Sequence, residues 1–369
     1  MKPDINGYIY PTINSELCLK CGVCKDICAF QNIPVNGDEP INTYVAINKN
    51  ESVLKESASG GVFAALASII LEKNGVAFGC SFNRNMEPEH ICINNLSDIK
   101  KLQGSKYVQS NINNTYSEAK KYLEDGIWVL FTGTPCQIAG LKSYIGKEYE
   151  NLITVDLICH GVPSAIFFKG YIEYLQDKLN GKIIDFKFRD KSKGWGLMGK
   201  AIYENNGIVK EKLIHPLSSY YYSYFLDGDI YRENCYECKY ACSSREGDFT
   251  IGDYWGIEKI HPNVETKKGV SVLLVNTQKG TNLVCNLKKY LNLIESDFQS
   301  VKLENSQLSK PTNKSSKRQL ILKTWRQGGW RLLADEYYKS NKIKIIISRF
   351  KIMIPESIKS FIKKLLKRG

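Results

Sequence analysis

The chain has 369 residues, of which 43% are hydrophobic and 24% charged, the composition of an ordinary globular protein. Residues 301–369 carry a net charge of +14 and residues 1–300 carry −1, so the sequence does not indicate a body that binds nucleic acid. No apolar stretch reaches the 18 residues of a membrane span, and the opening residues lack the apolar run of a secretory signal. Twelve cysteines in such a chain favour metal binding or redox chemistry over disulfides, and we expect a cytoplasmic protein.

The first predicted element is a cysteine-rich module over residues 1–40. Its thiols have the spacing C-x2-C-x2-C-x3-C of bacterial ferredoxins, at Cys18, Cys21, Cys24 and Cys28. The segment is too short for a hydrophobic core, so we expect a 4Fe–4S cluster to hold it together, with zinc as the alternative metal. Ala29 stands where such runs usually have proline, and only one run is present. We therefore expect the module to be incomplete, with a first run upstream of Met1.

Residues 41–300 alternate between apolar runs of strand length and helix-like stretches. The expected strands are Val76–Phe82, Trp128–Phe131, Leu152–Ile158, Ile183–Phe188 and Val270–Val275. The expected helices are Gly61–Lys73, Tyr116–Glu124, Pro135–Tyr144 and Ile166–Leu179. This alternation predicts an α/β domain, a largely parallel sheet with helices on its faces, with α+β as the alternative class. In such sheets ligands bind beyond the carboxyl ends of the strands.

A second group of thiols lies in this domain. Cys136 follows a predicted strand, and Thr134 and Pro135 suit the N-cap and first position of its helix. The helix dipole is expected to lower the pKa of a thiol in that first turn. Cys159 follows the next strand, at the same edge of a parallel sheet. The remaining candidates are Cys235, Cys238 and, in reserve, Cys242. The pattern predicts a second metal site, iron–sulfur or zinc, with isolated buried cysteines as the alternative.

Seven segments together resemble the beta subunits of coenzyme F420 hydrogenases and dehydrogenases. They are SASGGVFAALASIIL (57–71), GSKYVQS (104–110), LFTGTPCQIAGLK (130–142), DLICHGVPS (156–164), FRDKSKGWG (188–196), RENCYECKYA (232–241) and GDFTIGDYWG (247–256). The resemblance runs from about residue 1 to 290. It implies an iron–sulfur flavoprotein that binds FAD and exchanges electrons with a deazaflavin or another partner. It also implies a core cluster held by Cys136, Cys159, Cys235 and Cys238.

The resemblance further implies a flavin region made of three turns. Its residues are Ser59, Gly60, Gly61, Gly104, Ser105, Lys106, Tyr107, Thr132, Gly133 and Thr134. The residues themselves support this in part, because the first turn opens an apolar helix whose free N–H groups can hold a phosphate, and Lys106 adds a cation. Simple capping and turn chemistry is the alternative. His160 is a candidate to relay protons to the flavin, or else a loop histidine with a structural hydrogen bond.

Residues 301–369 are predicted to form a polar linker (309–318) followed by a basic helical tail. From Lys342 to Arg368 nine basic residues face a single acid, Glu356. Apolar residues recur at helical spacing at Ile358, Phe361, Ile362, Leu365 and Leu366. Such a helix either makes a peripheral contact with the anionic inner face of a membrane or packs on the protein with a solvated basic face.

Together these features predict an oxidoreductase that passes electrons between 4Fe–4S clusters, FAD and a deazaflavin, ferredoxin or small-molecule partner. Two other functions stay open. One is a non-catalytic electron-transfer subunit that docks on a catalytic partner, and the other is a zinc-stabilised transferase or binding module. Bound flavin and a cluster absorption band separate the zinc module from the other two. Turnover with a soluble dye, without added subunits, separates the enzyme from the relay subunit.

Overall fold

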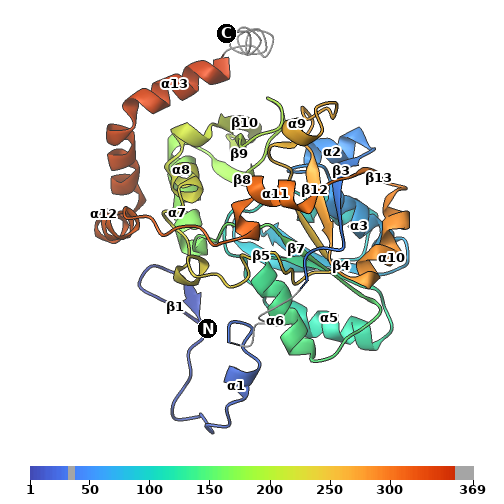
Figure 1. The fold of residues 1–369 in the computed structure, drawn as a ribbon. Helices are drawn as coiled ribbons and strands as arrows, with labels where there is room; N and C mark the ends of the chain where they lie inside the picture. Colours follow the sequence, from blue (N-terminus) through green and yellow to red (C-terminus); the bar gives the residue numbers. More distant parts are fainter. Residues whose placement is uncertain (32–37, 354–369) are drawn as a thin grey trace.

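The computed structural model describes residues 1–31 and 38–353 of the chain. Its centre is an eight-stranded mixed sheet (Figure 1). The strands are β3 (Asn42–Asn48), β4 (Val76–Phe82), β5 (Pro88–Ile93), β6 (Val129–Gly133), β7 (Leu152–Leu157), β11 (Phe249–Asp253), β12 (Ser271–Val275) and β13 (Leu291–Glu295). They lie in the order β13-β3-β12-β11-β7-β6-β4-β5, and the neighbours β11, β7, β6 and β4 are parallel.

Helices cover both faces of this sheet, as the alternating pattern predicts. They include α2 (Glu51–Glu56), α3 (Val62–Leu71), α4 (Ile99–Leu102), α5 (Thr115–Glu124), α6 (Pro135–Ile145), α9 (Ile257–Ile260), α10 (Gln278–Leu287) and α11 (Phe298–Glu304). Successive side chains of a strand point to opposite faces. Leu130 of β6 therefore packs with α3 and α10, while Val129 and Phe131 pack with α5 and α6. The α/β class with helices on its faces is confirmed.

The predicted strands match β4, β6, β7 and β12 to within two residues, but the sheet is parallel only in its centre. Strands β12, β13 and β5 are antiparallel to their neighbours. The expected strand at 183–188 belongs to a separate three-stranded antiparallel sheet. That sheet consists of β8 (Lys182–Lys187), β9 (Gly199–Asn205) and β10 (Ile208–Ile214). Alternation along one strand carries no information about which strands pair, so the sequence did not separate the two sheets.

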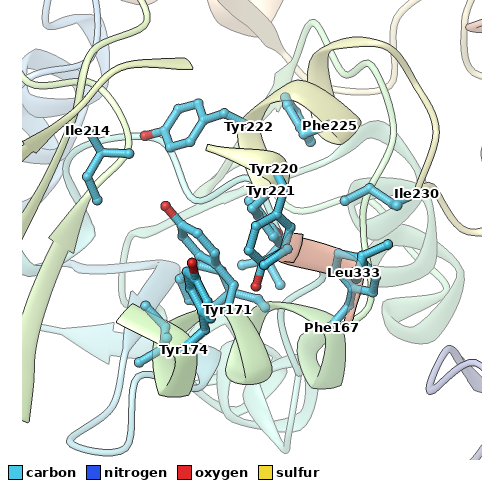
Figure 2. Packing of buried hydrophobic residues seen from close by; sticks show 14 of the residues in the cluster. Phe167, Tyr171, Tyr174, Ile214, Tyr220, Tyr221, Tyr222, Phe225, Ile230 and Leu333 are labelled. Atoms are coloured by element: carbon cyan, nitrogen blue, oxygen red, sulfur yellow. The ribbon is translucent and has the colours of Figure 1, made fainter. Parts of the chain in front are cut away.

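The smaller sheet shares a core rich in tyrosine with three helices, α7 (Ala165–Leu179), α8 (Tyr220–Leu226) and α12 (Arg318–Ser340). Figure 2 shows Tyr171, Tyr220 and Tyr221 packed together with Leu333 of α12. Helix α12 consists of two helical stretches that meet at Gly329, which has a φ of 62°. The stretch expected as a polar linker ends at a buried residue, Arg318, whose guanidinium donates to the carbonyl O of Tyr231.

The two ends of the chain contain the remaining elements. The N-terminal segment holds β1 (Lys2–Pro3), β2 (Ile9–Tyr10) and α1 (Val23–Asp26), and α13 (Lys342–Met353) follows α12. The five apolar residues expected to line a helical tail, at 358, 361, 362, 365 and 366, lie outside the described residues. Within residues 1–31 and 38–353, every helix is too short or too polar to cross a membrane.

Candidate functional site

A cavity of about 280 Å³ opens beyond the carboxyl ends of the parallel strands β4, β6, β7 and β11. Nine of the ten residues predicted to contact a flavin line it: Ser59, Gly61, Gly104, Ser105, Lys106, Tyr107, Thr132, Gly133 and Thr134. Cys159 and His160, which follow β7, line the same cavity. The three predicted turns are distant in sequence, and the sheet brings them to one site.

The turn at Ser59–Gly61 brings bare backbone to the wall of this cavity. A Cβ atom at Gly60 would lie 2.1 Å from the carbonyl O of Ala46, so only glycine fits. The Gly60 N–H donates to Oγ of Ser271 at 2.8 Å. Gly61, with a φ of 79°, is the N-cap of α3 and offers no side chain to the first helical turn. The N–H groups of that turn are therefore available to an anionic group in the cavity.

Lys191 fixes this turn from behind. Its ammonium donates to the carbonyl O atoms of Ser59 at 2.5 Å, Leu54 at 2.7 Å and Lys268 at 2.7 Å. Burial, and secondarily the charge of Arg189, lowers the pKa of Lys191 to about 8. The contacts of Lys191 have no local sequence signal, because its carbonyl partners lie in two distant segments, residues 54–59 and Lys268.

The turn at Thr132–Thr134 joins β6 to α6. Oγ1 of Thr132 donates to the carbonyl O of Phe78 at 2.9 Å, which fixes the strand end. Thr134 and Pro135 are the N-cap and first residue of α6, as predicted. The Thr134 N–H donates to Oε1 of Gln137 at 3.0 Å, and its Oγ1 lies 3.2 Å from Sγ of Cys136. One residue thus lines the cavity and contacts a candidate metal ligand.

A buried histidine extends this network beneath the cavity. Nε2 of His90 lies 3.0 Å from the carbonyl O of Thr132, which can only accept, so Nε2 carries the proton. Nδ1 therefore accepts from Oγ of Ser110 at 3.0 Å, and Ser110 in turn accepts from Nε2 of Gln137 at 3.0 Å. Burial lowers the pKa of His90 to about 4, so the ring is neutral at pH 7. His90 carries no sequence signal, whereas Ser110 and Gln137 lie in two of the segments that resemble the family.

The segment Gly104–Tyr107 forms a third side of the cavity. Nζ of Lys106 donates to the carbonyl O atoms of Leu102 at 3.2 Å and Gln103 at 2.8 Å, so its charge caps a helix end. The expectation of a free cation for a phosphate is thereby corrected, and burial lowers the pKa of Lys106. The Tyr107 ring stacks on Phe225 with centroids 4.4 Å apart.

A buried ion pair also lines the cavity. Both nitrogens Nη1 and Nη2 of Arg189 donate to the carboxylate of Asp253, at 2.6 and 3.1 Å, and Nη1 also donates to the hydroxyl O of Tyr107. Nε1 of Trp195 donates to the same carboxylate, and its ring stacks on Trp255 with centroids 5.0 Å apart. Arg189 is almost fully buried, and it pairs with Asp253 rather than with its neighbour Asp190.

Four thiols of the α/β domain influence one another's pKa, although among the described residues no three of them are grouped so that they would bind one metal ion. Burial raises the pKa of Cys159 well above its usual range, and the neighbouring thiols of Cys235, Cys136 and Cys238 add to the effect. Burial likewise raises the pKa of Cys235 to about 12 and of Cys136, and the Arg232 guanidinium acts in the opposite direction on both. The expectation that a helix dipole gives Cys136 a lowered pKa is wrong, because loss of solvation outweighs the backbone N–H groups.

Cys242 lies apart from these four. Its Sγ donates to the carbonyl O of Ser244 at 3.2 Å, and burial raises its pKa. The charges that act on Cys242 come from Arg245, Glu246 and Asp156. The placement favours Cys159 over Cys242 as the fourth member of the set.

The N-terminal thiols are placed differently. Cys21 and Cys24 are exposed, and Cys18 and Cys28 are half-buried. Gly22 has a φ of 82°, in keeping with the turn expected beside the second cysteine. Tyr240 joins this segment to the body, because its hydroxyl donates to the carbonyl O of Ala29 and its ring meets Phe30 edge-on at 6.1 Å. Among residues 1–31 and 38–353, no three side chains of Cys, His, Asp or Glu are grouped so that they would bind one metal ion.

Comparison with known proteins finds a family model that matches part of the site. Residues 127–299 match the model that describes the C terminus of the coenzyme F420 hydrogenase/dehydrogenase beta subunit. These residues are similar to that C-terminal region. The matched region contains Cys136, Cys159, Cys235 and Cys238, whereas the N-terminal cysteines and the Ser59 turn precede it.

Two similar proteins complete the comparison. The chain is 24% identical over 210 residues to a subunit of the F(420)H(2) dehydrogenase of Methanosarcina mazei, a match over 56% of this chain and 57% of that protein. It thus spans little more than half the length of this curated relative. A polypeptide in the solved F420-reducing [NiFe] hydrogenase complex of Methanosarcina barkeri, studied by xenon derivatization, is 17% identical with a TM-score of 0.48. That likeness covers 80% of this chain and 95% of the other.

Proposed function

We propose that this chain is an iron–sulfur flavoprotein oxidoreductase that passes electrons between 4Fe–4S clusters, FAD and a redox partner in the cytoplasm. The observation that supports this most strongly is the convergence of three sequence-distant turns, implied by the family resemblance to bind flavin, on one cavity that Cys159 also lines. The partner is a deazaflavin of the coenzyme F420 type, a ferredoxin, a catalytic subunit or a small metabolite.

The residues around the cavity fit a flavin nucleotide. Two helix N-termini border it, those of α3 at Gly61 and α6 at Thr134, and both favour the negative charge of a pyrophosphate. The lining away from these termini includes the rings of Tyr107, Phe225 and Trp255, which suit an aromatic ring system. The cavity thus combines a polar end with apolar walls, as nucleotide cofactor sites do.

The core thiols fit an iron–sulfur cluster by their chemistry. The four soft ligands that influence one another's pKa are Cys136, Cys159, Cys235 and Cys238. Arg232 supplies a positive charge beside them, which suits the negative charge of a thiolate-bound cluster. Tyr240, two residues after Cys238, contacts the N-terminal segment that has ferredoxin spacing. A cluster at the core thiols would therefore have an electron-transfer partner on the same chain. Zinc has no redox chemistry and could not exchange electrons with that partner, so the arrangement favours a cluster over zinc.

When bound, the cofactors supply the redox chemistry, and the chain supplies position and environment. The hydrogen bonds from His90 through Ser110 and Gln137 hold Thr134 between the cavity and Cys136. The buried pair of Arg189 and Asp253 fixes a further part of the cavity wall. His160 lines the cavity, its backbone carbonyl accepts from Oγ1 of Thr312 at 2.8 Å, and burial lowers its pKa. Its position at the cavity supports the proposed exchange of protons with the flavin.

The proposal is tested by purifying the full chain without oxygen and measuring its absorption spectrum with its iron, zinc and flavin content. We expect a broad cluster band, one flavin, and about eight irons per chain as two four-iron clusters require. Zinc without flavin would contradict the proposal in favour of a zinc-stabilised transferase or binding module.

A second candidate is a non-catalytic electron-transfer subunit, which the family description of a beta subunit favours. Reduction of a soluble dye by the isolated chain, with a reduced deazaflavin as the donor, would support the enzyme. The same cofactor content without turnover would support the relay subunit.

A further inference from the structure

We propose that helix α13 docks the protein on an anionic membrane surface. Helix α13 leaves α12 at one side of the molecule, away from the eight-stranded sheet (Figure 1). The interaction would be peripheral, since no helix among the described residues can cross a bilayer. The proposal is independent of the flavin and cluster chemistry.

The orientation of α13 is fixed by a narrow inner face. Ile345 is 8% exposed and belongs to the tyrosine-rich core, and Ser348 is fully buried. The helix contacts α12 and the short 3-10 helix Pro216–Ser218 on this side. The opposite face is therefore held outward by packing and is not free to turn inward.

That outer face is apolar. Ile343 is 75% exposed, Ile346 52%, Ile347 45% and Phe350 64%. Their positions follow the spacing i, i+3, i+4, i+7, which places them on a single stripe of the helix. Exposed single apolar residues are ordinary, but four in one stripe on a short helix form a patch that water solvates poorly.

The basic residues beside the apolar stripe indicate what binds to it. Lys342 and Lys344 are exposed beside the stripe, and each lies roughly 100° or less from Ile343 around the helix, on opposite sides. From Lys342 to the C-terminus the sequence holds nine basic residues and one acidic residue. A second copy of the chain would bring like charges together, and a nucleic acid would leave the apolar stripe exposed. An apolar stripe with basic edges suits the interface of an anionic bilayer, where acyl chains take the stripe and headgroups take the lysines.

The test is co-sedimentation of the full-length protein with vesicles of phosphatidylcholine alone or with 30 mol% phosphatidylglycerol. We expect binding to the anionic vesicles, and a roughly tenfold or greater loss of partitioning for the double variant Ile346→Glu/Phe350→Glu, which places acids in the stripe. The double variant Lys342→Gln/Lys344→Gln should lose roughly fivefold per lysine, since each basic residue near the surface contributes about 1 kcal/mol.

A matched control is Leu303→Glu, which makes the same change at a residue of α11 that is 85% exposed. It should bind vesicles as the unchanged protein does, and near-ultraviolet circular dichroism should show the same fold in every variant. Failure of the unchanged protein to sediment would overturn the proposal. So would equal sedimentation of the stripe variant and the control. A concentration-dependent dimer that Phe350→Glu abolishes, without vesicle binding, would assign the stripe to a subunit interface instead.

Discussion

The core cysteines and the N-terminal cysteines differ in how firmly the surrounding structure fixes them. The core thiols follow strand ends and helix starts of a sheet packed on both faces, and their neighbours are fixed by hydrogen bonds that run through the fold. The N-terminal thiols lie on a segment whose only regular elements among the described residues are two-residue strands and one four-residue helix. Its apolar residues Leu17, Leu19 and Val23 are exposed by half or more. The fold therefore holds the core thiols in place by its own packing, and we expect the order of the N-terminal segment to depend on a bound metal.

Removing the metal should give the largest difference between the two regions. After treatment with an iron chelator under oxidising conditions, we expect a protease to cut within residues 1–31 at once, while the sheet domain resists. Limited proteolysis followed by mass spectrometry locates the cuts. Equal protection of the N-terminal segment before and after chelation would contradict its dependence on metal.

Breaking the buried pair of Arg189 and Asp253 should lower the stability of the α/β domain whether or not metal is bound. We expect Arg189→Met to lower the free energy of unfolding by about 3 kcal/mol, because Asp253 is left as a carboxylate without its cation. Arg331→Met, which breaks an exposed pair with Asp177, should cost less than about 1 kcal/mol. Urea denaturation monitored by circular dichroism measures both. Equal costs would mean that the cavity wall does not depend on the pair.

The sequence predicts the local features around the core thiols better than the long-range contacts that surround the cavity. The helix start at Thr134 and Pro135 and the strand end before Cys159 are local features, so both were placed correctly. The salt bridge from Arg189 to Asp253 joins residues 64 apart, and the ammonium of Lys191 donates to carbonyls from two segments that are both distant from it in sequence. Such contacts depend on how strands and loops pair in three dimensions, which no local pattern encodes.

Lowering the pH should reduce the stability of the α/β domain because of the buried ring of His90. Its folded pKa is about 4, below an unfolded value near 6.5, so the unfolded state takes up a proton first as the pH falls. The contribution of His90 is complete above pH 6.5, and about 3 kcal/mol of it is lost by pH 4. Urea denaturation across this range measures the loss. His90→Gln should flatten this part of the pH profile, and an unchanged profile would show that the ring does not titrate as the geometry indicates.

The smallest effect is expected at the contact between the two regions. Tyr240→Phe removes the hydroxyl that donates to the carbonyl O of Ala29 and keeps the ring against Phe30. We expect a loss of about 1 kcal/mol in the docking of the N-terminal segment, and no change in the unfolding of the body. Hydrogen exchange of residues 1–31 measures the first quantity. A destabilised body would show that Tyr240 acts within the core instead.

The most direct test of the account compares the cofactor content of Cys159→Ala and Cys21→Ala in the full chain, purified without oxygen. Each variant should lose about four irons, because each lacks a ligand of one cluster. Only Cys159→Ala should also change the flavin absorption, since Cys159 lines the cavity. Full iron content in Cys159→Ala, with an unaltered flavin spectrum, would contradict a cluster site prepared by the fold.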